Sequence, residues 1–158
     1  MGEFGSIDEI LEFAISREVE ANEFYTLLAD RVRNPAMAEL LLEFAKEELE
    51  HKAKLELEVM KRGKVMTEVA REAEAKKLAD FKMADYLVDV GDWLDMDYKD
   101  LLLLAMKKEK ISFRLYVDLS AMVNDEESHE VLLSLAEEEA RHKARFEIEY
   151  DETVLKEK

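Results

Sequence analysis

One nine-residue stretch occurs twice in this chain, and the repeat constrains the fold more than any other feature. Residues 45–53 read AKEELEHKA, and residues 136–144, which begin 91 positions later, read AEEEARHKA. The match extends without insertion or deletion over residues 14–58 and 105–149. We interpret it as a duplicated helical hairpin whose two halves share one site.

Composition and periodicity predict long helices. The 158 residues include only 4 Gly and 1 Pro, and apolar residues recur at three- and four-residue spacing between charges. Helix signals support this interpretation: a capping box begins at Ser6, Asn34-Pro35 is typical of a turn that opens a new helix, and Gly63 predicts a stop. We expect four helices, at about residues 6–33, 35–62, 98–123 and 125–150.

The order of these helices predicts the architecture. A break of one or two residues inside each pair makes the paired helices antiparallel neighbours. The segment between the pairs, about residues 64–97, is long enough to run the length of a bundle as a crossover connection. We therefore expect an all-α protein, a ferritin-like four-helix bundle of two duplicated antiparallel hairpins, forming a single domain over residues 1–158.

Charge and cysteine content exclude several classes of function. A net charge of −16 argues against a nucleic-acid partner and favours cations. The absence of cysteine excludes disulfides, zinc–thiolate sites and iron–sulfur clusters. No signal peptide is visible, and the longest apolar run, residues 101–106, is too short to span a membrane. We expect a cytoplasmic protein with no membrane partner.

Each copy of the repeat contains a Glu-x-x-His motif. Residues three apart lie about 60° apart around a helix, so both side chains can point to one place. A glutamate on the preceding helix lies at a similar distance from the turn, so an antiparallel hairpin brings it to the same height. The predicted metal ligands are Glu18, Glu48 and His51 from the first hairpin and Glu109, Glu139 and His142 from the second.

Four carboxylates and two imidazoles favour a pair of divalent first-row metals. Iron suits such oxygen-rich donors, manganese is also possible, and both leave positions open for a small molecule. Without metal, four buried carboxylates would raise one another's pKa and have to protonate. Two divalent cations would balance the four negative charges, so we expect two Fe ions as the cofactor.

A single Glu-x-x-His is weak evidence, because a charged helix face rich in Glu produces it by chance. Glu126 and His129 form such a motif, but Ala38 occupies the position of His129 in the first copy. We therefore assign His129 to solvent. The shared offset of all six predicted ligands is what favours the metal site over a solvated face.

Two tyrosines also repeat at the same offset. Tyr25 and Tyr116 follow Glu18 and Glu109 by seven residues, which places them on the same helix face but about 10 Å along the axis. We expect core packing, with each hydroxyl bonded to a buried carboxylate. A catalytic role in electron or proton transfer is the alternative. The small residues Ala21 and Ser112 are expected to leave space beside the metals.

These motifs resemble the ferritin-like di-iron carboxylate proteins, specifically their rubrerythrin-related branch. The resemblance covers residues 7–150, and it implies that Glu48 and Glu139 bridge two irons while the other four ligands are terminal. It rests on Glu18-x-x-Ala21-x-x-x-Tyr25, Glu48-x-x-His51, Glu109-x-x-Ser112-x-x-x-Tyr116 and Glu139-x-x-His142.

The sequence departs from the family in two respects. A full rubrerythrin has a rubredoxin domain with four cysteines, whereas this chain has no cysteine, so we expect an external electron-donor protein. Rubrerythrins also carry a further Glu three residues after the third-helix ligand, where this chain has Ser112. That Glu serves when one iron changes its ligand with oxidation state.

The resemblance implies an oxidoreductase that reduces hydrogen peroxide or dioxygen, with a role in oxidative stress. The alternatives are a ferroxidase or iron-handling protein, which for storage needs a hollow assembly, and a non-catalytic metal-binding bundle. We also expect a homodimer, for which an exposed group in the crossover, Tyr86, Leu87 and Trp93, is the predicted contact.

Overall fold

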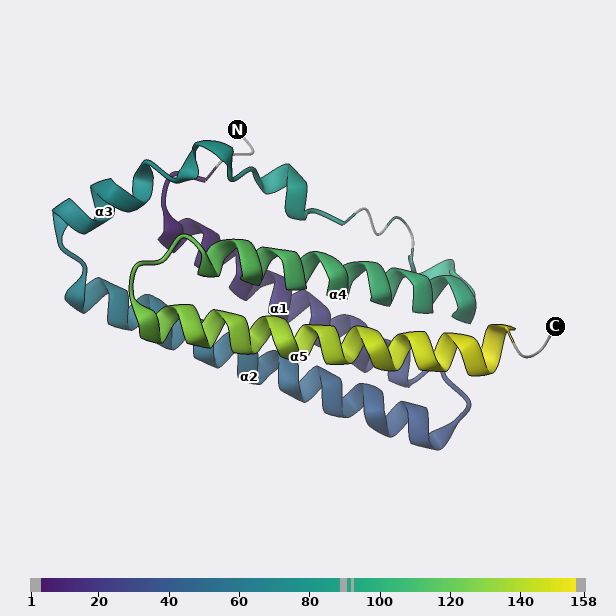
Figure 1. Cartoon of the computed structure of the whole chain (residues 1–158). Coiled ribbons are helices and arrows are strands. Elements are labelled where there is room, and N and C mark those ends of the chain that lie inside the picture. Colours follow the sequence, from purple (N-terminus) through teal and green to yellow (C-terminus); the bar gives the residue numbers. More distant parts are fainter. Residues whose placement is uncertain (1–3, 89–90, 92, 156–158) are drawn as a thin grey trace. The chain divides into compact units, whose positions relative to one another are not determined.

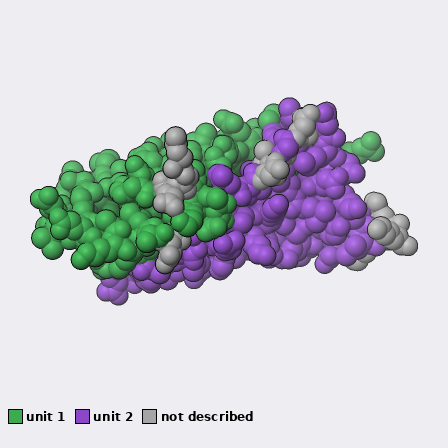
Figure 2. Space-filling model, turned by 90° about the horizontal axis from the view of Figure 1, so that it is seen from above, with its two compact units in different colours: residues 1–85, 122–124 green, residues 86–121, 125–158 purple. Residues whose placement is uncertain are grey.

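The computed structural model describes residues 4–88, 91 and 93–155. Over this part of the chain the long elements are all α-helices, which confirms the all-α prediction. The chain divides into two compact units, coloured green and purple in Figure 2. The first comprises residues 1–85 and 122–124, and the second comprises residues 86–121 and 125–158.

The first unit is built on the antiparallel hairpin of α1 (Ile7–Ala29) and α2 (Pro35–Val65) (Figure 1). Ser6 caps α1 by accepting a hydrogen bond from the Glu9 backbone N–H, as the capping box predicts. Asn34 caps α2 in the same way, through the N–H of Ala36. Both caps confirm the helix starts that the sequence indicates.

The second unit repeats this hairpin with α4 (Tyr98–Ser120) and α5 (Glu126–Tyr150), followed by one π-helical turn, Asp151–Leu155. The two starts and the end of α4 each lie 91 residues after their counterparts in the first unit. The caps follow the same rule, since Asp97 corresponds to Ser6 and Asp125 to Asn34. The duplication seen in the sequence is therefore a duplication of structure.

Apolar side chains at helical spacing form the core of each unit. In the first, Ile10, Leu28 and Leu55 have no exposed surface. In the second, Leu102 and Phe146 are equally buried. Burying a side chain of this size contributes about 1.5–3 kcal/mol, so these positions hold the hairpins together.

The segment between the hairpins contains a short helix, α3 (Glu68–Ala75), and three 3₁₀ turns, Leu78–Asp80, Met83–Tyr86 and Trp93–Asp95. Residues 89–90 and 92 of the predicted crossover lie outside the described residues, as do the predicted domain ends, residues 1–3 and 156–158. Thr67 caps α3 through the N–H of Ala70. The cap at Thr67 thus gives the start of the segment local order.

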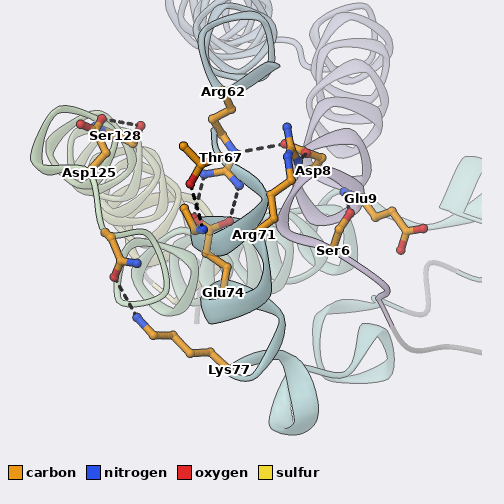
Figure 3. A network of polar contacts seen from close by, with 12 residues as sticks. Ser6, Asp8, Glu9, Arg62, Thr67, Arg71, Glu74, Lys77, Asp125 and Ser128 are labelled. Atoms are coloured by element: carbon orange, nitrogen blue, oxygen red, sulfur yellow. Dashed lines mark hydrogen bonds and ion pairs between the residues drawn. The ribbon is translucent and has the colours of Figure 1, made fainter. Parts of the chain in front are cut away.

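Buried charges attach α3 to the first hairpin (Figure 3). Arg62 of α2 makes two hydrogen bonds to the carboxylate of Glu74, and both side chains are about 5% exposed. Its Nε also donates to Asp8 of α1, 3.1 Å away, and Arg71 of α3 donates to the same carboxylate. These four residues link three helices.

Helix boundaries differ from the predicted ones in three places, one of which is the helix predicted to reach Val123, which ends at Ser120. The helix predicted to reach Arg33 ends at Ala29, where Asp30 and Arg31 turn back onto the carbonyls of Leu27 and Leu28. Each hairpin connection is therefore five residues, not one or two. The helix predicted to stop at Gly63 continues to Val65, because the helical hydrogen bonding runs past the glycine until the Met66 N–H donates to the Arg62 oxygen at 2.9 Å.

The predicted exposed group of the crossover is only partly exposed. Leu87 is half exposed, but Tyr86 is buried, and its hydroxyl donates to Asp118 at 2.7 Å. Tyr86 is thus a packing residue of the second unit, and the prediction that it forms a dimer contact is wrong. The homodimer itself stays a prediction. No helix among the described residues is both long and apolar enough to cross a membrane.

Candidate metal centre

The first hairpin brings three buried ligand groups to one place. The Nδ1 atom of His51 lies 3.2 Å from Glu18 Oε2 and 3.2 Å from Glu48 Oε1. Glu48 and His51 are one turn apart on α2, whereas Glu18 reaches them from α1. None of the three side chains is more than 1% exposed.

The second hairpin repeats this cluster. The Nδ1 atom of His142 lies 3.5 Å from Glu109 Oε2 and 3.7 Å from Glu139 Oε1. Glu109 belongs to α4, and the other two residues belong to α5. All three are buried, and none of the side chains exceeds 3% exposure. Each hairpin thus presents one imidazole and two carboxylates.

The antiparallel pairing explains why these residues meet. Glu18 lies eleven residues before the end of α1 at Ala29, and Glu48 lies thirteen after the start of α2 at Pro35. At 1.5 Å per residue the two positions differ by only about 3 Å along the hairpin. Since the same relation holds in the second hairpin, one geometry produces both clusters.

The donor set of each cluster fits a divalent metal. One ligand atom from each of the three residues lies within 4.8 Å of the others, in both hairpins. Oxygen and imidazole nitrogen donors suit iron and manganese, and burial of several carboxylates is unfavourable unless cations or protons compensate their charge. These buried clusters therefore indicate two positions that suit a metal ion.

The repeated tyrosines are deeply buried. Tyr25 has no exposed surface and Tyr116 has 1%. The ring of Tyr25 packs edge-on against Phe44, with 6.3 Å between centroids. This agrees with core packing, while the bonding of the hydroxyls to a carboxylate and any transfer role stay predictions. Ala21 is buried and Ser112 is partly exposed.

His129 is not the solvent-facing residue that we expected. It is half-buried at the start of α5, and its Nδ1 lies 2.7 Å from the backbone oxygen of Ser120 at the end of α4. The contact connects the two ends of the five-residue turn. His129 therefore has a structural role in the turn, outside the ligand clusters.

Sequence reasoning missed a half-buried tyrosine–carboxylate pair in the second hairpin. The Tyr98 hydroxyl, at the start of α4, donates to Glu149 Oε2 at 2.6 Å near the end of α5. Burial, together with this hydrogen bond, raises the pKa of Tyr98 far above its ordinary value. Because position 98 corresponds to Ile7 in the first copy, the duplication gave no signal for this pair.

The sequence profile of one protein family, described as Rubrerythrin, matches residues 9–150. Among solved structures, the chain is similar to a putative ferritin-like diiron-carboxylate protein from Thermotoga maritima, with 21% identity and a TM-score of 0.75. That alignment covers 98% of this chain and 99% of the other. The likeness confirms the predicted fold, a ferritin-like bundle.

A second solved structure with the same fold is a hypothetical protein from Pyrococcus furiosus. It is 28% identical, with a TM-score of 0.69, and the alignment covers 92% of this chain and 89% of that one. No functionally curated protein sequence matches the chain. Both solved structures thus share the fold of this chain.

Proposed function

Because this chain belongs to the rubrerythrin family, we propose that it is an oxidoreductase that binds two iron ions and reduces hydrogen peroxide or dioxygen. In this proposal the electrons come from a separate donor protein. Manganese fits the same ligands, so the identity of the metal is part of the proposal.

One observation carries the proposal: each of two duplicated hairpins buries a carboxylate–carboxylate–imidazole cluster. A solvated charged face would not place Glu18, Glu48 and His51 below 2% exposure with their ligand atoms around one point. The second hairpin repeats the arrangement at the same offset, which is expected if each cluster supplies one metal position.

We propose that the two clusters form one dinuclear centre. By resemblance to the family, these six residues would hold the two metals, with Glu48 and Glu139 shared between them and the remaining four as terminal ligands. Four carboxylates then balance the charge of two divalent ions, which removes the electrostatic penalty of their burial.

When bound, two ferrous ions supply the two electrons that convert one hydrogen peroxide and two protons into two waters. The chain's own contribution is to hold the ligands and exclude water. Tyr25 and Tyr116 bury their rings two helical turns after Glu18 and Glu109, and the ring of Tyr25 packs against Phe44, which excludes water from this part of the core. Such packing fixes the imidazoles and carboxylates in place before the oxidant arrives.

The test is a peroxide titration of protein loaded anaerobically with ferrous iron. We expect the absorption spectrum to change until one peroxide has been added per two irons, and a chemical reductant such as dithionite to restore the starting spectrum. A spectrum that peroxide and dioxygen leave unchanged would overturn the proposal. The same titration with manganese-loaded protein identifies which metal supports the reaction.

A matched pair of variants ties the result to the ligands. Glu48→Gln replaces a proposed bridging carboxylate by an amide of the same shape, and it should abolish the spectral change. Glu137→Gln makes the same substitution at an exposed position two residues before Glu139, and it should titrate like the unaltered protein. Equal behaviour of the two variants would show that the reaction does not depend on this site.

A further inference from the structure

A groove on the second hairpin is lined by cations in an otherwise strongly acidic protein. It has a volume of about 420 Å³ and is open to solvent between α4 and α5. The net charge of the chain is −16, yet three of the six lining residues are cationic and only one is acidic. The lining residues are Lys110, Phe113, Arg114, Ala140, Lys143 and Glu147.

The groove lies on the turns that carry the metal ligands. Lys110 directly follows Glu109, and Ala140 and Lys143 directly follow Glu139 and His142. Successive residues are about 100° apart around a helix and 1.5 Å apart along it, so the groove is at the height of the ligands. The ligands are buried and the groove is exposed, which separates them by roughly one helix thickness, about 10 Å.

Comparison of the two copies shows that two of the three cations, Lys110 and Arg114, are specific to the second hairpin. The first copy has Val19, Asn22 and Glu23 where the second has Lys110, Phe113 and Arg114. The lysine–glutamate pair on the other wall is retained in both copies, at 3.2 Å for Lys52–Glu56 and 3.0 Å for Lys143–Glu147. Over these six positions the first copy has one cation and two carboxylates, whereas the second has three cations and one carboxylate.

The two copies also differ in shape at these positions. Ala140 replaces Leu49, which removes a side chain that is 45% exposed in the first hairpin. In the first copy, Asn22 is tied down by donating to the Ala45 backbone oxygen at 2.8 Å. Its counterpart, Phe113, leaves 37% of its surface in solvent. Aromatic residues and arginine are enriched at protein interfaces relative to the rest of the surface, and the groove presents one of each, Phe113 and Arg114.

We propose that this groove is the docking site of an acidic electron-transfer protein, the external donor on which the proposed function depends. The net negative charge of the chain repels an acidic partner, whereas the groove, with a net charge of +2 from its lining residues, attracts it and sets its orientation. Phe113 supplies the apolar contact. Docking here brings the donor within one helix thickness of the centre, which favours electron transfer.

The electron balance requires two such encounters in each cycle. A one-electron donor is oxidised once per encounter, and two donors together supply the two electrons that, with two protons, convert one hydrogen peroxide into two waters. Because each oxidised donor must dissociate before the next reduced donor binds, the affinity has to be low and the association rate high. Charge steering over a small contact meets that requirement, since electrostatic complementarity raises association rates more than affinity.

The test measures binding of a small acidic [2Fe–2S] ferredoxin, used as the probe, to the iron-loaded protein by calorimetry at low salt. We expect binding that weakens as ionic strength rises. The variant Lys110→Glu/Arg114→Glu should weaken it at least about tenfold, because like charges then face each other. Arg33→Glu/Lys64→Glu changes the net charge equally at two exposed positions outside the groove, and it should have a much smaller effect.

A second variant tests the groove without changing charge. Ala140→Leu introduces the residue that the first hairpin has at Leu49, and it should weaken ferredoxin binding by filling the groove. Iron content and helical circular dichroism establish that each variant is folded. Equal weakening by the two double variants, or no ferredoxin binding by the unaltered protein at low salt, would overturn the proposal. So would equally tight binding of a basic cytochrome c.

Failure of this inference is distinguishable from failure of the proposed function. Protein reduced chemically needs no docked donor, so the groove variants should still react with peroxide after reduction with dithionite while losing turnover driven by ferredoxin. If chemically reduced protein does not react with peroxide, the proposed function fails, and the binding measurements still decide whether the groove takes an acidic protein.

Discussion

The Nδ1 atom of His51 lies 3.2 Å from Oε2 of Glu18, which belongs to the neighbouring helix. The corresponding atoms of His142 and Glu109 are 3.5 Å apart. Each contact joins the second helix of a hairpin to the first at the same height. Because the carboxylate and the imidazole are both buried, each hairpin presents a ready-made set of metal donors and not a surface ion pair.

The contact between Glu18 and His51 predicts that loss of a terminal ligand lowers the metal content of the protein. Glu18→Gln should reduce the metal content from two ions per chain to about one, because the amide is a poorer donor than the carboxylate. Glu109→Gln should have the same effect through the other cluster. Elemental analysis of protein purified under identical conditions provides the measurement. Unchanged metal content in both variants would remove these glutamates from the ligand set.

Tyr25 offers a test that separates packing from electron or proton transfer. Tyr25→Phe keeps the ring, which is fully buried, and should leave metal content unchanged and stability lower by about 1–3 kcal/mol if the hydroxyl has a buried partner. A role limited to packing predicts the same rate of peroxide reduction as in the unaltered protein. Stopped-flow absorption after anaerobic reduction measures that rate, and a tenfold loss would instead assign the hydroxyl to the reaction.

The buried pair of Arg62 and Glu74 should dominate the stability of the α3 attachment. Arg62→Met leaves the Glu74 carboxylate buried without its guanidinium, and we expect a loss of about 3–5 kcal/mol in the free energy of unfolding. Denaturant unfolding followed by circular dichroism measures it. Arg17→Ala removes an exposed ion pair with Glu20 and should cost less than about 1 kcal/mol. Similar losses in the two variants would contradict the assignment.

Asp8 gives this network a defined pH dependence. Burial alone would raise the pKa of Asp8, but hydrogen bonds and charge from Arg71 and Arg62 outweigh it and hold the pKa below its ordinary value. A lowered pKa means that ionised Asp8 stabilises the fold at neutral pH, and that this contribution disappears as the pH falls below about 3.9. The stability difference between the unaltered protein and Asp8→Asn should therefore shrink in acid. A difference that stays constant down to about pH 2 would contradict this.

The long-range geometry of this protein was predictable because it depends on a duplication. The offset of 91 residues, together with caps at Ser6 and Asn34, determines where the hairpins begin, and antiparallel pairing then determines which glutamate meets which histidine. These relations need only helical periodicity and chain connectivity. The helix ends were less predictable. A glycine predicts a helix end at Gly63, but the helical hydrogen bonding continues past it to Val65.

Features that occur in one copy only were the ones that sequence reasoning missed. Two such features are the pairs Tyr98–Glu149 and Arg62–Glu74, whose members are 51 and 12 positions apart. No periodic pattern in the sequence predicts either pair. Tyr86 reads as an exposed aromatic in a polar segment, but its contact with Asp118 is decided by how the segment folds back onto α4. Contacts of this kind depend on tertiary packing, which local propensity does not determine.

Anomalous X-ray scattering from crystals of protein purified without added metal, recorded at the iron and manganese edges, tests the central claim most directly. We predict two peaks per chain at the iron edge, one beside Glu18, Glu48 and His51 and the other beside Glu109, Glu139 and His142. A single peak, a peak elsewhere, or no peak at either edge would contradict the assignment of a dinuclear centre to these six residues.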